Sequence, residues 1–98
     1  MLYAVRFFDK PDCQDIRAAH MDAHLTWLDD NSDVVLIGGS LRNAPGEPPV
    51  GGMWLVDATD RDAIEALLRT DPFWIHGLRA GYEIFFWRKA FPDRKVLI

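Results

Sequence analysis

The chain has 98 residues, of which 49% are hydrophobic and 12% aromatic, and its net charge is −4 with His neutral. This length predicts one domain spanning residues 1–98, and the acidic balance argues against a nucleic-acid partner. No apolar run reaches the roughly 18 residues of a membrane helix, the first residues lack a signal-peptide pattern, and a single cysteine excludes an internal disulfide. We therefore expect a cytoplasmic protein without a membrane partner.

The hydrophobic pattern predicts elements in the order β-α-β-β-α-β. The segment 2–8 alternates as a strand, with Arg6 as the one charge on its second face. A helix capped by Asp12 follows and runs to about Asp30. The remaining elements are strands at 34–41 and 51–58 joined by a Pro/Gly hairpin loop, a helix from Thr59 to about Thr70, a short turn from Pro72 to Gly77, a strand at 80–89 and a tail at 90–98.

This order is typical of the ferredoxin-like α+β fold, in which two helices cover one face of a four-stranded antiparallel sheet. The domain core would span about 2–89, and the apolar end of the tail, 96–98, would dock on another subunit. The second sheet face would carry Trp54, Phe85 or Phe86, and Trp87. An open apolar face of this kind usually marks an interaction surface. We predict a homodimer packed sheet to sheet.

The first helix is unusual because its apolar arc over 16–28 also carries Arg17, His20 and His24. Burying such groups costs free energy unless each finds a partner. His20 is the candidate general acid/base, since imidazole titrates near neutral pH. The alternative is a core histidine bonded to a backbone carbonyl. The spacing of the two histidines also occurs at zinc sites, but Met21 replaces the expected Glu and no further ligand cluster is present, so we predict no metal.

Asp71 is the candidate partner of His20, because a carboxylate can orient an imidazole for proton transfer. Its position before Pro72 is also explained by helix capping alone. Arg17, one turn before His20, could bind a substrate carboxylate or phenolate through two hydrogen bonds, or lie along the helix surface. Further candidates for the substrate-binding wall are His24, Ser40 and Arg6.

These motifs together resemble the YCII-related (YciI-like) family over about residues 2–87. The resemblance rests on Arg17-x-x-His20, Gly38-Gly39-Ser40, Gly51-Gly52, Asp71-Pro72-Phe73, Gly77-Leu78 and an aromatic last strand. It implies a ferredoxin-like fold, a dimeric α+β barrel, and an active site built on a histidine and an aspartate, which fall on His20 and Asp71. Where the family usually has Gly-Pro, this chain has Gly39-Ser40, which changes the pocket wall. Related proteins include lyases that remove chloride from chlorinated hydroxyquinones and muconolactone isomerases.

Two functional hypotheses follow. In the first, the protein is an enzyme without a cofactor: Arg17 or Arg6 holds an aromatic or lactone-like anion, and His20, oriented by Asp71, moves a proton in an elimination or isomerisation. The glycines form no G-x-G-x-x-G pattern, so no dinucleotide cofactor is expected. In the second, the domain is a non-catalytic module that binds a small ligand or a partner protein. A hydrogen bond between His20 and Asp71 beside an open cavity would favour the enzyme, whereas side chains that lie far apart, or are sealed under Trp27 and Phe73, would count against it.

Overall fold

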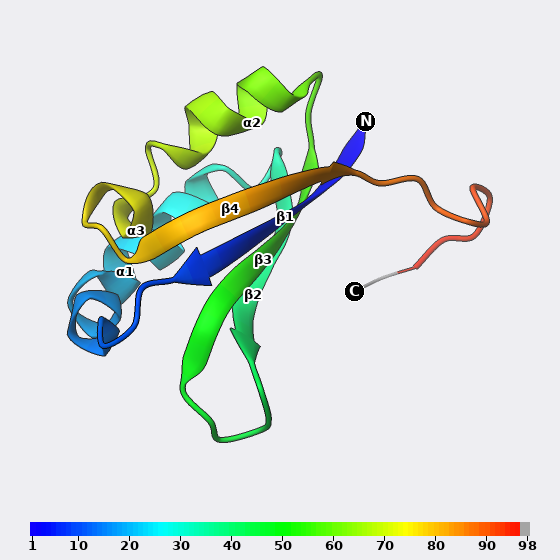
Figure 1. Cartoon of the computed structure of the whole chain (residues 1–98). Helices are drawn as coiled ribbons and strands as arrows, with labels where there is room; N and C mark the ends of the chain where they lie inside the picture. The colour runs from blue at the N-terminus through cyan, green and yellow to red at the C-terminus, as the bar shows by residue number, and fades with distance from the viewer. Residues whose placement is uncertain (97–98) are drawn as a thin grey trace.

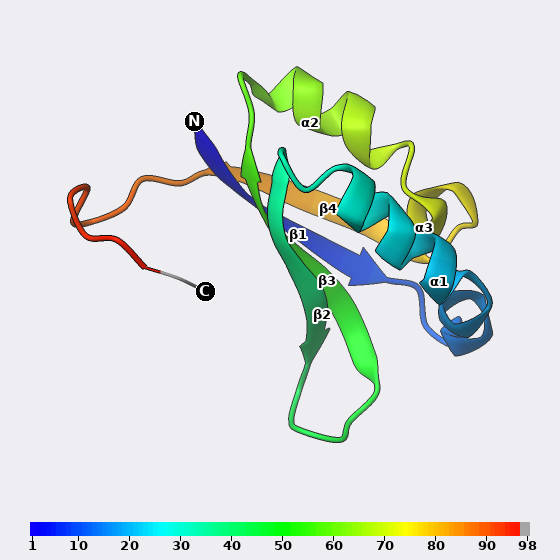
Figure 2. The same cartoon turned by 180° about the vertical axis from the view of Figure 1, so that it is seen from behind.

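The computed structural model describes residues 1–96 and contains a four-stranded sheet with its helices packed on one side (Figures 1 and 2). All three strand pairs are antiparallel, in the order β2-β3-β1-β4. The ferredoxin-like α+β prediction is confirmed by this topology. The elements are β1 Leu2–Asp9, α1 Gln14–Asp30, β2 Val35–Arg42, β3 Pro49–Asp57, α2 Arg61–Leu68, α3 Pro72–Ile75 and β4 Arg79–Phe86.

Helix boundaries follow local capping chemistry, with two corrections to the sequence prediction. The N-cap of α1 is Cys13 without a side-chain hydrogen bond, whereas Asp12 has a φ of 59° and lies in the preceding turn. The N-cap of α2 is Asp60, not Thr59, and its carboxylate accepts from the Ala63 amide at 2.8 Å. For α3 the prediction is confirmed, since Asp71 caps it and Pro72 opens it.

The core lies between the sheet and the helices and is built from alternate residues of the strands. Tyr3, Val5 and Phe7 of β1 point into it, as the apolar odd positions predicted. Trp54 was expected on the open face, and this expectation is wrong. It lies opposite Val5 in the register, is 1% exposed, and packs against Phe7 with ring centroids 4.5 Å apart. Because paired residues point to the same face, the register alone puts Trp54 in the core.

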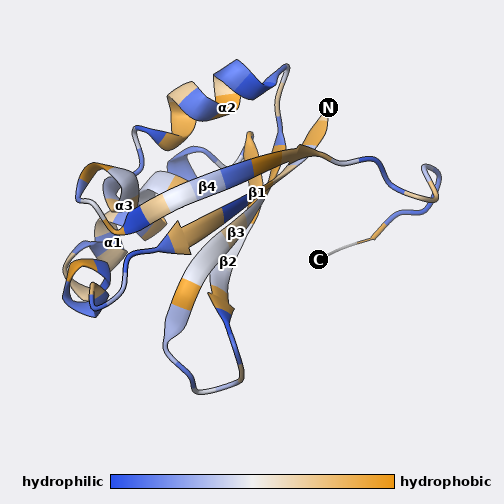
Figure 3. Cartoon of the chain, viewed as in Figure 1, coloured by the Kyte–Doolittle hydropathy of each residue, from blue (hydrophilic) through white to orange (hydrophobic). Residues whose placement is uncertain are grey.

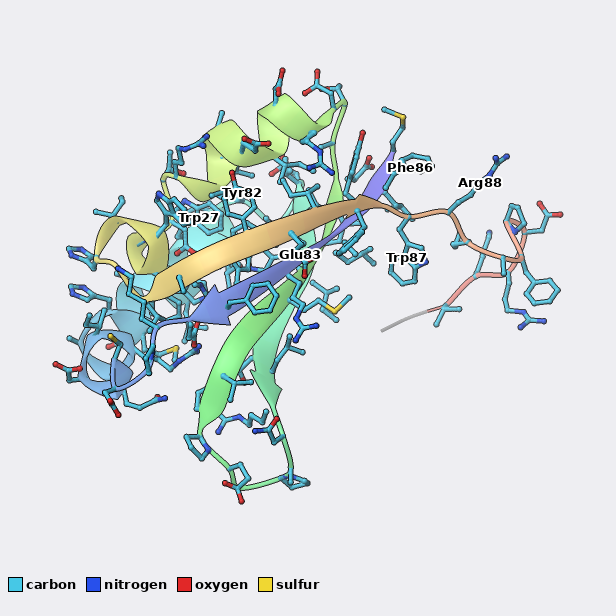
Figure 4. The ribbon with its side chains drawn as sticks, viewed as in Figure 1. Trp27, Tyr82, Glu83, Phe86, Trp87 and Arg88 are labelled. Atoms are coloured by element: carbon cyan, nitrogen blue, oxygen red, sulfur yellow. The ribbon has the colours of Figure 1, made fainter. Side chains whose placement is uncertain are left out.

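The other sheet face carries a band of exposed apolar residues, which we call the open face. Met53 is 41% exposed and Phe85 52% exposed. Figure 3 shows apolar stretches along the sheet. Figure 4 shows Tyr82 toward the helices with Trp27, and Glu83, the next residue along β4, directed away from them.

After β4 the chain leaves the sheet as an extended tail (Figure 1). The last strand ends at Phe86, earlier than predicted. Phe91 and Val96 in the tail that follows are exposed to solvent. The predicted docking of the chain end involves residues 97–98, which lie outside the described residues. Within residues 1–96 the structure contains no helix with the length and apolar character of a membrane span.

Candidate functional site

A buried histidine–aspartate pair joins α1 to the start of α3. His24 Nδ1 and Asp71 Oδ1 lie 2.7 Å apart, and the two side chains are 9% and 1% exposed. The same carboxylate oxygen accepts from the Phe73 amide at 3.1 Å, so Asp71 both caps α3 and binds the imidazole. Because the ionised carboxylate only accepts hydrogen bonds, Nδ1 carries the proton and Nε2 is left with its lone pair in the neutral ring.

The predicted hydrogen bond between His20 and Asp71 is wrong, because His24 occupies that place. The His20 ring instead stacks on His76, with centroids 3.6 Å apart and planes within 3°. The two α1 histidines are one turn apart and share a helix face, about 6 Å from each other along the axis. α3 lies beside α1 with its N-terminal Asp71 level with His24 and its C-cap His76 level with His20. The position at which α3 docks along α1 therefore decides which histidine contacts Asp71.

The Phe73 ring packs against the charged groups of the site. It is fully buried, and the His24 ring stacks on it at 3.9 Å with the planes 13° apart. The guanidinium carbons of Arg17 and Arg79 each lie 5.2 Å from its ring centroid. Stacking and cation–π contacts of this kind restrain the positions of flat cationic groups. Phe73 thus holds three side chains from α1 and β4 in one place.

Asp9, the last residue of β1, bridges the two arginines. Its Oδ2 accepts from Arg17 Nη2 at 2.5 Å and its Oδ1 accepts from Arg79 Nη1 at 2.7 Å. All three side chains are less than a tenth exposed. Arg17 also donates to the Gly51 carbonyl at 3.5 Å. Burial lowers the pKa of the Arg79 guanidinium from its ordinary value, and the hydrogen bond and charge of Asp9 oppose that shift.

Asp9 and Arg79 were not predicted as site residues from the sequence, although the glycines on β3 indicated that another group approaches this strand closely. A Cβ at Gly52 would stand 3.1 Å from Arg79 Nη2 and 3.2 Å from Nη1. Gly52 therefore leaves the space on the helix side of the sheet that the guanidinium fills. A glycine pair in a buried strand indicates close approach by another group, and Arg79 is that group.

A cavity of about 150 Å³ lies between α1 and β2, beside these charged groups. Its wall includes His24 and Ser40. Arg42 also lines it and donates to Ser40 Oγ at 3.2 Å and to the Glu47 carbonyl at 2.7 Å. The cavity is lined by Arg17, Met21, His24, Leu25, Leu28, Gly38, Gly39, Ser40, Arg42, Phe73 and Arg79.

The structure thus gathers Asp71, Arg17, His24 and Ser40 of the predicted site, and separates two others from them. Arg6 lies on the open face, where its guanidinium stacks over Phe8 at 4.7 Å. His20 lies one turn away from His24 and stacks against His76 at the end of α3. A larger hollow of about 310 Å³ lies on the open face, but no titratable side chain lines it, so the smaller cavity is the better chemical site.

The arrangement suits proton transfer next to a cavity wall that carries positive charge. His24 is oriented by Asp71 in the manner of histidine–carboxylate acid/base pairs, and the arginines lie within the same cavity wall. Among residues 1–96, no group of three or more His, Cys, Asp or Glu side chains is arranged to hold a metal ion. The prediction that no cofactor takes part rests on the sequence.

Comparison with known proteins gives one family and several solved structures of similar fold. The sequence model of the YCII-related domain matches residues 1–88. No match was found among curated proteins. The structure is similar to the 5-chloro-2-hydroxyhydroquinone dehydrochlorinase TftG from Burkholderia phenoliruptrix AC1100, solved with 2,5-dihydroxybenzoquinone, at 24% identity, covering 90% of this chain and 94% of that one with a TM-score of 0.81.

Two further solved structures share the fold at lower similarity. A putative antibiotic biosynthesis monooxygenase from Bacteroides thetaiotaomicron is 16% identical, with coverage of 99% and 95% and a TM-score of 0.58. SnoaB, a cofactor-independent oxygenase from Streptomyces nogalater, is 15% identical, with coverage of 94% and 96% and a TM-score of 0.52. At these identities the likeness describes the α+β fold and not the reaction.

Proposed function

The chain belongs to the YCII-related domain family, and from this membership and the geometry of His24 and Asp71 we propose that it is an acid/base enzyme of lyase or isomerase type. Its substrate is a small aromatic or lactone-like anion. The observation that carries the proposal is the 2.7 Å contact between His24 Nδ1 and Asp71 Oδ1 in the wall of a cavity. The similarity to a hydroquinone dehydrochlorinase supports the lyase option.

In the proposed reaction His24 Nε2 removes a proton from a C–H or O–H of the bound ring. The electron pair left behind forms a double bond, and in an elimination the leaving group departs as an anion. In an isomerisation the same proton returns to another carbon. Asp71 keeps its charge throughout and stabilises the imidazolium, as carboxylates do in histidine-based acid/base pairs. No electron donor or acceptor is needed for either course.

The neighbouring histidine provides a matched control for this role. We expect His24→Gln to lower kcat by about 10²–10⁴-fold, the usual contribution of a general acid/base, whereas His20→Gln on the same helix retains most of the activity. Chloride release from 5-chloro-2-hydroxyhydroquinone and ring opening or isomerisation of a lactone panel provide the assays. Activity in His24→Gln equal to that in His20→Gln would remove His24 from the mechanism.

We further propose that the protein forms a homodimer through the open face. Phe85, Met53 and Ile37 are between 38% and 52% exposed on that face, and a contiguous exposed apolar surface favours association. Light scattering at micromolar concentration should give twice the chain mass. Phe85→Glu should produce monomers, while Ile75→Glu, at an exposed position on α3 (60%), should not. A wild-type monomer at these concentrations would contradict the proposal.

A further inference from the structure

Two buried guanidinium groups beside the cavity keep hydrogen-bond donors without partners. Arg17 is 7% and Arg79 6% exposed, yet the Nε atom of each is buried and has no partner among the described residues. Asp9 engages the Nη ends of both side chains. Unpaired buried donors are rare because desolvation without a new bond costs free energy, so each such group calls for an explanation.

The charges in this wall do not cancel. Asp9 neutralises one of the two arginines, and Asp71 is already engaged with His24 and the Phe73 amide. Arg42 adds a third guanidinium to the cavity lining, in a chain whose net charge is −4. A local excess of positive charge with free N–H donors is complementary to an oxygen anion.

The cavity also limits the size of its ligand. Its volume of about 150 Å³ equals that of an engineered protein cavity known to hold benzene, roughly 150 Å³. Met21, Leu25 and Leu28 of α1 supply apolar lining, which suits the faces of a ring. A single six-membered ring therefore fits this space.

We propose that the cavity between α1 and β2 binds a single-ring organic monoanion, with its carboxylate or phenolate oxygen against the guanidinium groups of Arg17 and Arg79 that line it. This inference rests on the proposed function and names its substrate class. The anionic oxygen lies on the arginine side, the ring lies along the apolar residues of α1, and the opposite edge of the ring faces His24. Asp9 is a positioning residue, because it holds both guanidinium groups by their Nη ends.

The test observes the arginine side chains directly and needs no turnover. In ¹⁵N-labelled wild-type protein, benzoate in low-chloride buffer at neutral pH should shift the Nε–H resonances of Arg17 and Arg79 in a saturable manner. Benzamide has the same ring and no charge and should leave them unchanged. Arg69, exposed at the C-cap of α2 and paired with Glu65, is the internal control. No shift with benzoate, or equal shifts with benzamide, would overturn the proposal.

A conservative variant then separates donor geometry from charge. Arg79→Lys keeps the positive charge but lacks the planar array of guanidinium donors, and we expect its affinity for benzoate to fall about tenfold, the effect of one charge-assisted hydrogen bond. Arg69→Lys should bind as the wild type does. Unchanged affinity in Arg79→Lys would refute the assignment of Arg79. His24→Gln should still bind benzoate, so loss of the catalytic proposal and loss of the anion site are distinguishable.

Discussion

Removing Asp9 should destabilise the protein far more than removing an exposed aspartate that also forms an ion pair. In Asp9→Ala, two arginines lose hydrogen bonds of 2.5 and 2.7 Å and stay buried without the carboxylate that pairs with both of them. Breaking a buried pair in this way costs about 3–5 kcal/mol. A domain of this size has a total stability of about 5–15 kcal/mol, so the variant should lie close to its unfolding threshold.

The matched control is Asp57→Ala. Asp57 pairs with the N-terminal ammonium of Met1 at 2.9 Å, but both groups are more than half exposed, and such pairs contribute about 0–1 kcal/mol. Urea unfolding followed by tryptophan fluorescence, at one fixed protein concentration, measures both variants. If Asp9→Ala lost no more free energy of unfolding than Asp57→Ala, the buried Asp9–Arg17–Arg79 cluster would not stabilise the fold as a coupled ionic unit. Adding Arg79→Met to Asp9→Ala should recover part of the loss.

Two smaller perturbations test local packing and capping by the same unfolding assay. Gly52→Ala places a methyl group 3.1 Å from the Arg79 guanidinium and should lower the free energy of unfolding by about 1–3 kcal/mol through overpacking. Gly39→Ala, with open space at its Cβ, should change stability little. Equal losses of stability in the two variants would show that Arg79 adjusts freely. Asp60→Ala should lower the free energy of unfolding by about 1 kcal/mol because it removes the cap of α2, while Thr59→Ala should have almost no effect. A larger loss of stability in Thr59→Ala than in Asp60→Ala would identify Thr59 as the cap.

The fold was predictable because its determinants are local and periodic. Alternation along β1 identified its buried face, and Asp71-Pro72 marked the start of α3. The same alternation placed Arg6 on the second sheet face, where the structure has it. Trp54 was misplaced because β3 contains two adjacent glycines followed by four consecutive apolar residues, 53–56, and so has no clear alternation. Only its pairing with Val5 decides which face it joins.

The sequence by itself determined that the first helix buries polar groups and that Asp71 caps a short helix. It could not determine which histidine meets Asp71, because His20 and His24 share one helix face and differ only by one turn along the axis. That choice depends on how far along α1 the short α3 docks, which is a tertiary property. The Asp9–Arg17–Arg79 cluster was hidden for the same reason. Its members come from β1, α1 and β4, and only packing of the sheet against α1 brings their charges together.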